Sequence, residues 1–332
     1  MRIIALAVLL VLASGDSRAA ETASFLDIGV GARGLGMGEA YTALADDANA
    51  LYWNPAGLSR LEKREFAASH AELFESTRLD SLAYAHPTSQ GTFAAGVTYL
   101  SQGKIDGRDS FGRQTAGYSA SDAAMSLGYA RKLDMVDVGA SVKYIRSHIG
   151  SAEAQGVAVD VGTKRSFDRL TVGAAVRNLG PGLKFQDQRN DLPLRVAAGA
   201  GYAFSAGHAA AAEVVGGPRG TGTNVSLGGE FQAVKSFYLR AGYTTRTAVP
   251  GGSGFDAARG LTMGLGFRSK VWSLDYAITP SGELGRGHRR QFLGRERRHR
   301  NVGIDSQPVE PDHAGRHQAD GRAREPARDY SH

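Results

Sequence analysis

The chain has 332 residues, with 44 Gly, no Cys, 42% hydrophobic residues and a formal net charge of +6, and the lack of Cys excludes a disulfide-stabilised fold. Much of the positive charge lies in residues 286–332, which hold 11 Arg and 7 acidic residues without interleaved aromatic side chains, so nucleic-acid binding is not expected. The mean hydropathy of −0.26 fits a soluble protein, but it also fits a membrane β-barrel, whose strands carry one apolar and one polar face.

The first 19 residues have the layout of a secretory signal peptide. Arg2 gives a positive start, residues 3–13 form an apolar run, and Ser17 and Ala19 are the small residues of a cleavage site. The run is too short to cross a bilayer as a helix, and a buried N-terminal helix is the alternative. We therefore expect an exported protein of the bacterial envelope.

A glycine-rich stretch, "DIGVGARGLGMG", follows at residues 27–38 and contains the spacing G-x-G-x-x-G at Gly29, Gly31 and Gly34. A dinucleotide site needs a buried strand before these glycines and, about twenty residues later, an acidic residue that ends a second strand. The preceding "ASFLD" is too short and polar, and no βαβ alternation follows. No cofactor is therefore expected, and the glycines are expected to allow close backbone packing.

The segment continues to residue 64 without a strand pattern. Within "ADDANALYWNPAGLSRL", Asn54 is the expected N-cap and Pro55 the first residue of a short helix. Asp46 and Asp47 are expected to lie in a solvated turn rather than to bind a cation. Residues 20–64 thus predict a compact unit of small and polar residues.

From residue 65 the dominant pattern has a period of two residues. In "VDVGASVKY", for example, Val142 and Tyr144 lie on the face opposite Asp137 and Lys143, which indicates a strand with one apolar side. Most of the predicted strands are nine to twelve residues long, close to a tilted membrane strand. About fourteen are predicted, at residues 65–72, 78–86, 91–101, 122–131, 136–147, 154–165, 169–178, 193–204, 207–216, 223–233, 236–245, 260–269, 271–279 and 288–295.

The connections between these strands alternate in length. The predicted loops 102–121, 179–192 and 246–259 all fall on one side, whereas the other side has only tight turns. Long loops at one rim and short turns at the other are typical of an outer-membrane barrel. A soluble propeller or sandwich, which is the alternative, gives no reason for this sorting.

The two strand faces predict an outside and an inside. The apolar face should contact lipid, because a closed barrel leaves no unpaired backbone in hydrocarbon. A lumen of this size is wider than wall side chains can fill, so residues 20–64 are expected to form a hatch inside it. The charged residues expected to face the lumen are Asp137, Lys143, Asp160, Lys164, Arg177, Glu230, Arg240, Arg268 and Asp275.

The C-terminal residues depart from the barrel pattern. Residues 296–332 are rich in Arg, His and Pro and lack alternation, which predicts disorder. We expect the reading frame to shift near Arg289 and to replace the closing strand. A genuine periplasmic tail is the alternative.

The stretch "FLDIGVGARGLGMGEAYTALADDANALYWNPAGLSRL" resembles the N-terminal signature of the PorV/PorQ family, a branch of the FadL-like outer-membrane barrels. Over about residues 24–285 the resemblance implies a fourteen-stranded barrel with a hatch in its lumen. It also implies that Asn54, Pro55, Ala56 and Gly57 carry the hatch motif, and that outer-membrane lipid and the barrel assembly machinery are partners. The hatch gates hydrophobic solutes in FadL-type members, whereas PorV-type members bind cargo and the translocon of type IX secretion.

The long loops are polar and glycine-rich and the predicted lumen is charged. These features favour a protein-binding accessory of type IX secretion or of the envelope. A hatch-gated outer-membrane transporter for long-chain fatty acids or other hydrophobic small molecules is the alternative. No His-x-x-x-His pair, Gly-x-Ser-x-Gly elbow or P-loop occurs, so no catalytic residue, metal or cofactor is expected.

Overall fold

The computed structural model describes residues 22–74, 76–108, 111–185, 187–217, 222–246, 257–280 and 286–296. The predicted signal peptide at residues 1–19 and the predicted tail beyond residue 296 lie outside these ranges. Among the described residues, no helix is long and apolar enough to cross a membrane.

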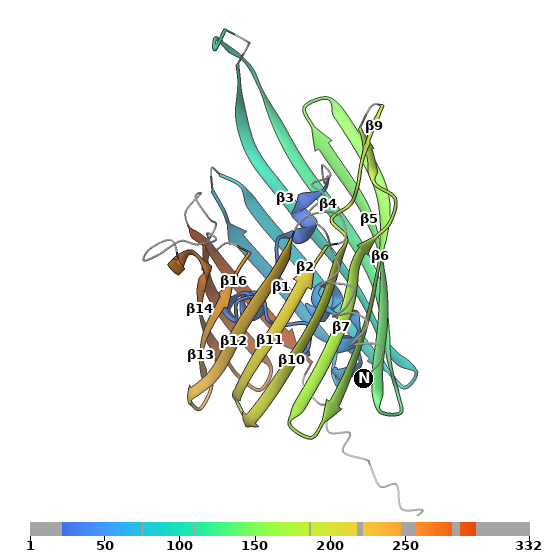
Figure 1. The fold of residues 1–332 in the computed structure, drawn as a ribbon, viewed down its shortest axis with the longest axis vertical. Coiled ribbons are helices and arrows are strands. Elements are labelled where there is room, and N and C mark those ends of the chain that lie inside the picture. Colours follow the sequence, from blue (N-terminus) through green and yellow to red (C-terminus); the bar gives the residue numbers. More distant parts are fainter. Residues whose placement is uncertain are drawn as a thin grey trace, which may run out of the picture. The chain divides into compact units, whose positions relative to one another are not determined.

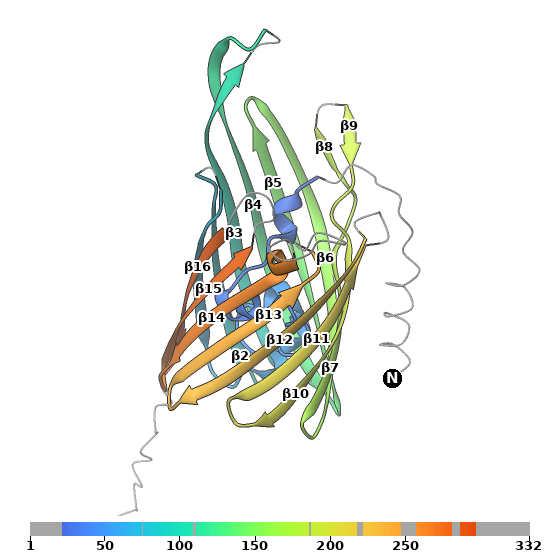
Figure 2. The same cartoon turned by 60° about the vertical axis from the view of Figure 1, so that its left-hand side comes forward.

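Fourteen strands form a closed antiparallel barrel in which the last strand pairs with the first (Figures 1 and 2). Each strand pairs with the next along the chain, except that β7 pairs with β10 across a separate two-stranded hairpin. This architecture confirms the predicted fold class. The barrel strands are β1 (Glu65–Glu72), β2 (Arg78–Thr88), β3 (Gly91–Arg108), β4 (Gln114–Leu133), β5 (Val136–Ile149), β6 (Ala152–Phe167), β7 (Leu170–Leu179), β10 (Arg195–Ser205), β11 (His208–Gly216), β12 (Thr223–Val234), β13 (Phe237–Thr244), β14 (Leu261–Arg268), β15 (Trp272–Pro280) and β16 (Arg286–Arg295).

The predicted loop at residues 102–121 is wrong over most of its length. Strands β3 and β4 continue to Arg108 and from Gln114, and their hairpin projects past the ends of the other strands (Figures 1 and 2). The backbone ladder persists to the pair Arg108↔Gln114, although the polar side chains there do not alternate with apolar ones. The predicted loop at 179–192 likewise contains a small hairpin, β8 (Leu183–Phe185) and β9 (Gln188–Asn190).

The expected loss of the closing strand near Arg289 is also wrong. Strand β16 runs through this residue and pairs with β1 from Glu72↔His288 to Glu65↔Arg295. Gln291 and Leu293 are buried on its inner face, whereas Phe292 is exposed on the outer face. The stretch "RRQFLGR" therefore alternates as a barrel strand, and its many Arg residues obscured this pattern in the sequence.

The outer wall is apolar and the inner wall is polar or small. Large hydrophobic side chains are exposed along the outside, while Ala, Gly and charged residues line the inside, a pattern typical of a barrel in lipid. Members of the outer set on successive strands are Leu82, Val97, Leu127, Val142, Val159, Leu227, Leu239, Leu265 and Leu274.

Residues 22–64, called the hatch below, lie inside the barrel, where Figure 1 shows them as blue helices. They form η1 (Ser24–Asp27), α2 (Ala32–Gly36), α3 (Ala50–Trp53) and η2 (Pro55–Arg60). Helix α2 packs on β13 to β16, and η2 packs on β3 to β6. Helices α2 and η2 thus contact opposite parts of the wall.

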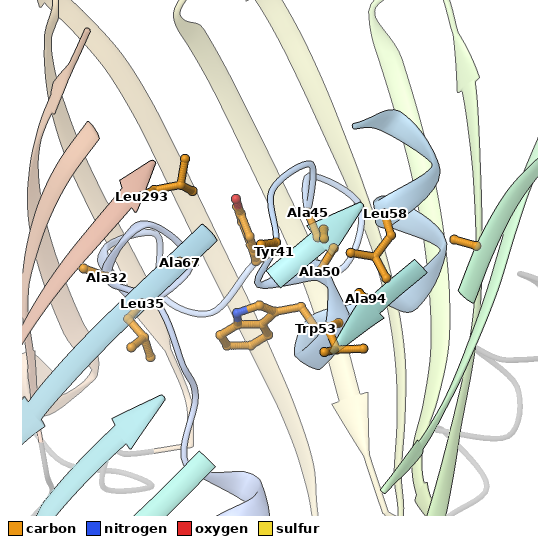
Figure 3. Packing of buried hydrophobic residues seen from close by; sticks show 14 of the residues in the cluster. Ala32, Leu35, Tyr41, Ala45, Ala50, Trp53, Leu58, Ala67, Ala94 and Leu293 are labelled. Carbon is orange, nitrogen blue, oxygen red and sulfur yellow. The ribbon is translucent and has the colours of Figure 1, made fainter. Parts of the chain in front are cut away.

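The hatch packs around Trp53 in a hydrophobic core that it shares with small and apolar residues of the wall, such as Ala67 and Leu293 (Figure 3). The rings of Trp53 and Tyr41 meet edge to face with centroids 6.1 Å apart, and Trp53 Nε1 donates a hydrogen bond of 2.9 Å to the Val30 carbonyl. Leu35, from α2, and Leu58, from η2, are fully buried in the same cluster. The indole therefore joins helices that are far apart in the sequence.

Candidate functional site in the hatch and lumen

The predicted hatch motif lies at the junction of α3 and η2. Asn54 is fully buried and caps η2, because its Oδ1 accepts a hydrogen bond of 3.2 Å from the Ala56 amide. Its Nδ2 donates to the carbonyls of Thr42, at 2.9 Å, and Thr163, at 3.2 Å. Pro55 takes the first helical position, where no amide is needed. One side chain thus joins η2, another hatch segment and β6.

Glycines of the wall make room for the hatch backbone. A Cβ at Gly162 would overlap Asn54 Oδ1, and one at Gly242 would overlap the amide of Gly38. Gly57, the last residue of the motif, has no room for a Cβ beside the Ala45 carbonyl. Such contacts are possible only where a side chain is absent from the wall or the hatch. The glycine-rich composition therefore follows from close packing between the two.

Ion pairs fasten the hatch to the wall. Arg33, in α2, donates to Glu230 of β12 at 2.9 Å and to Asp46 within the hatch. Arg240 of β13 then bridges Glu230 and Asp275, at 2.7 Å each. Since Glu230, Arg240 and Asp275 are buried away from water, their mutual attraction is less screened than at a surface, whereas the Asp46 side chain is half exposed. The pairs form a chain from the hatch across three wall strands.

Further pairs repeat this arrangement around the lumen. Arg60 of η2 donates to Asp137 of β5 at 2.6 Å, and Asp27 of η1 accepts from Arg195 of β10 at 2.7 Å. Glu39 pairs with Arg246, which follows β13. The hatch is therefore held by charge at η1, α2 and η2.

The nine predicted lumen residues have inward positions on their strands. Eight are buried, and Arg268 is half-buried with its guanidinium 4.4 Å from the centre of the Tyr238 ring. Lys143 and Asp160 form a pair at 2.7 Å, and Lys164 donates to the Ala45 carbonyl. The structure brings Glu230, Arg240 and Asp275 into one cluster, and it places Asp137 directly opposite Lys164 on the neighbouring strand.

Burial changes the proton affinities of polar groups in the hatch. Burial opposes charge on Arg33, but Asp46 and Glu230 outweigh it and raise the pKa of that guanidinium. Burial raises the pKa of Asp47, and Arg33 partly offsets the effect. Burial also raises the pKa of Tyr41, whose hydroxyl donates to Asp47 at 3.0 Å. Arg33 therefore stays charged and organises the polar side of the hatch.

A cavity of about 290 Å³, called the lumen pocket below, lies between the hatch and the long-loop end of the wall. The hatch contributes Asp27, Glu39, Tyr52 and Trp53. The wall contributes charged side chains from β7, β10 and β11 and from the end of β13, namely Arg177, Arg195, Glu213 and Arg246. The pocket thus has charged side chains from both the hatch and the wall, and its two aromatic rings come from the hatch.

A second feature was not expected from the sequence, namely an apolar recess at the long-loop end of β2, β3 and β5. Phe25 and Leu26 of η1 are buried there against inward-facing Leu79, Leu100 and Ile145. The expectation of a charged lumen is therefore wrong for this part of the wall. The signal lies in adjacent apolar pairs such as Tyr144-Ile145, where the inner face is apolar as well as the outer one.

The outer wall carries a hollow of about 790 Å³ across β13 to β16, β1 and β2. Its lining is mostly apolar, but His70 and Asp80 of neighbouring strands meet there at 2.7 Å. The hollow lies outside the lumen and is not part of the hatch site. Among the described residues, no group of three or more His, Asp and Glu side chains is placed to hold a metal ion.

Solved structures of transporters share this fold. The Pseudomonas putida toluene transporter TodX matches at 15% identity and a TM-score of 0.58, over 84% of this chain and 98% of that one. The Ralstonia pickettii toluene transporter TbuX matches at 15% and 0.58, over 81% and 99%. A Pseudomonas aeruginosa FadL homologue matches at 12% and 0.51, over 80% and 96%. At these identities the likeness confirms a FadL-like fold and nothing finer.

No curated protein sequence matches the chain. The resemblance to the PorV/PorQ family stays a prediction. The model of the Uncharacterised protein family (UPF0164) matches residues 13–267, which is more than half of the chain, and the protein therefore belongs to this family.

Proposed function

We propose that the protein is an outer-membrane transporter for hydrophobic small molecules and that the hatch gates its lumen. The apolar recess carries this proposal, because it is an inward-facing hydrophobic site that η1 fills with Phe25 and Leu26. A ligand of similar character could take this place once η1 moves. The shared fold of the toluene transporters supports the proposal, as does the apolar outer wall, which suits a bilayer.

A charged lumen is compatible with protein partners, but its charges also join the hatch to the wall. Arg33, Arg60 and Arg195 pair with carboxylates across the hatch–wall boundary. These ion pairs hold the hatch in place and do not require a bound protein. The projecting β3–β4 hairpin keeps a type IX secretion or envelope accessory as a second candidate. Co-purification of large envelope proteins without any bound hydrophobic ligand would favour that candidate.

Toluene binding and uptake by the wild type and the variant F25A/L26A test the proposed transport function. The double substitution removes the side chains that occupy the recess, so a hydrophobic ligand no longer competes with η1. We expect radiolabelled toluene to bind the detergent-solubilised variant about two- to tenfold more tightly than the wild type, and cells carrying either protein to take it up faster than cells without it.

The control variant L133A removes an exposed leucine at the β4–β5 turn and should leave binding unchanged. Equal affinity of F25A/L26A and wild type, with uptake no faster than in cells lacking the protein, would contradict the proposal.

A further inference from the structure

The lumen pocket contains a buried arginine with two hydrogen-bond donors that have no acceptor among the described residues. Arg177 is 7% exposed, and its Nε and Nη1 atoms are buried without a hydrogen-bond acceptor. Among the described residues, none forms an ion pair with it. Glu213, in the same pocket, supplies an opposite charge nearby but no hydrogen bond. Buried donors without an acceptor are unfavourable, and beside a cavity they indicate where a ligand with acceptor oxygens could bind.

The strand register makes this charge more costly. Arg177 of β7 lies directly opposite Arg195 of β10, and like charges in directly paired positions repel each other. Asp27 of the hatch pairs with Arg195 and so neutralises one of the two guanidiniums. Arg177 lines the same pocket and has only the charge of Glu213 nearby, without an ion pair in direct contact among the described residues.

The remaining acids of the pocket are already engaged. Glu213 accepts hydrogen bonds from the amides of Tyr41 and Thr42, at 2.8 and 2.7 Å, and from the Thr42 hydroxyl at 2.8 Å. Glu39 pairs with Arg246. Neither carboxylate reaches the guanidinium of Arg177 with a hydrogen bond, so its buried Nε and Nη1 have no acceptor among the described residues.

The other residues of the pocket and its volume indicate the size and polarity of the ligand. The guanidinium carbon of Arg177 lies 5.5 Å from the centre of the Tyr52 ring and 5.6 Å from that of Trp53. These rings and Val215 give apolar surface beside the charge. A cavity of about 290 Å³ is at the lower end of small-molecule sites, so the body must be compact.

We propose that the lumen pocket binds a small aromatic carboxylate of about the size of benzoate. The carboxylate accepts hydrogen bonds from Arg177, a geometry for which a guanidinium is well suited, and the ring packs beside Tyr52 and Trp53. The inference rests on the proposed function in one respect, since the ligand enters the same hatch-gated lumen. It adds a charge requirement that a plain hydrocarbon does not meet.

Calorimetric titration of the full chain in detergent tests the assignment, with benzoate as the probe and toluene as its uncharged counterpart of similar size. We expect benzoate to bind at least about tenfold more tightly than toluene to this pocket, and R177M to lose that advantage. R146M, which removes an arginine paired with Glu153 on the outer wall, should bind benzoate like the wild type. R177K keeps the positive charge but lacks the paired N–H donors of the guanidinium. It should bind benzoate less tightly than wild type but more tightly than R177M.

Each outcome decides the matter. Equal benzoate affinity of wild type and R177M overturns the proposal, and so does complete displacement of benzoate by an equal concentration of chloride. If R177M fails to fold, an unchanged benzoate affinity of R177K overturns it instead. Toluene uptake without benzoate binding retains the transporter and removes this inference, whereas benzoate binding that depends on Arg177 without toluene uptake does the reverse.

Discussion

Asn54 shows how much of the hatch depends on single side chains. Its oxygen caps η2 and its two amide hydrogens bond to carbonyls of the hatch and of β6. A buried amide with all three bonds leaves no polar atom of the junction unpaired. Removal of the amide therefore affects three parts of the molecule together.

We expect N54A to destabilise the hatch by about 1–3 kcal/mol, the sum of a lost cap and of carbonyls left without donors. Hydrogen exchange of amides in residues 50–61 should become faster, while amides of the barrel strands keep their protection. Q90A changes an amide side chain in the exposed β2–β3 turn and serves as the control. If exchange in N54A equals that in Q90A, Asn54 does not hold the junction.

The sequence predicted residue roles where the cause is local. The Asn-Pro pair identified the start of η2, and strand alternation placed Arg177 on the inner face. That two donors of Arg177 lack an acceptor could not be predicted, because Asp27 pairs with Arg195 instead, 168 positions away in the chain. Pairing of this kind is set by how the hatch docks and not by spacing.

At the scale of elements, α2 lies against β14 with no side chain between their backbones. A Cβ at Gly36 would lie 3.1 Å from the Cα of Gly264. Thr262 of β14 accepts a hydrogen bond of 2.9 Å from the Gly38 amide and donates one of 3.2 Å to the Gly36 carbonyl. A gate that moves α2 must break these contacts first.

The variant G36C/G264C tests whether α2 moves, and since the chain has no Cys the new pair is free of competing thiols. We expect a disulfide to form, because the two backbones are close enough for one, and toluene uptake to fall to about a tenth or less until a reductant restores it. The single variants G36C and G264C control for the added side chains. Unimpaired uptake in the oxidised double variant would falsify a gate that requires α2 to leave β14.

Strands were predicted well where apolar and polar side chains alternate, and poorly where only backbone hydrogen bonds hold the strand. The centres of the first thirteen barrel strands follow from a period of two, whereas the Arg residues of β16 obscure it. The outer part of the β3–β4 hairpin does not alternate, and it is held by ladder hydrogen bonds that leave no trace in the side-chain pattern. The apolar recess was missed for the related reason that hydrophobic residues on both faces hide the period.

For the whole molecule, the decisive joint is the one between β1 and β16. Eight residues of β1 pair with β16, and Glu65 accepts a hydrogen bond of 2.6 Å from Arg295 at its end. The Glu296 amide adds a bond of 3.1 Å to the Arg64 carbonyl. The described strand pairing is therefore complete at residue 296.

We expect removal of residues 297–332 to leave the barrel intact, and removal of residues 286–332 to abolish it, because the second truncation deletes β16. Gel mobility with and without heating distinguishes a closed barrel from an unfolded chain. A folded product from the longer truncation, or none from the shorter one, would show that closure does not depend on β16 alone.

The carboxylate of Glu65 is bound on both sides, since its Oε1 accepts a hydrogen bond of 2.7 Å from the Ala48 amide of the hatch while Oε2 meets Arg295. During biogenesis β1 is made directly after the hatch, and β16 is made last. An undocked hatch leaves this carboxylate without its amide donor and free to turn away from the arriving strand. We therefore expect the joint to act as an assembly checkpoint, at which a chain seals its wall efficiently only after the hatch is seated.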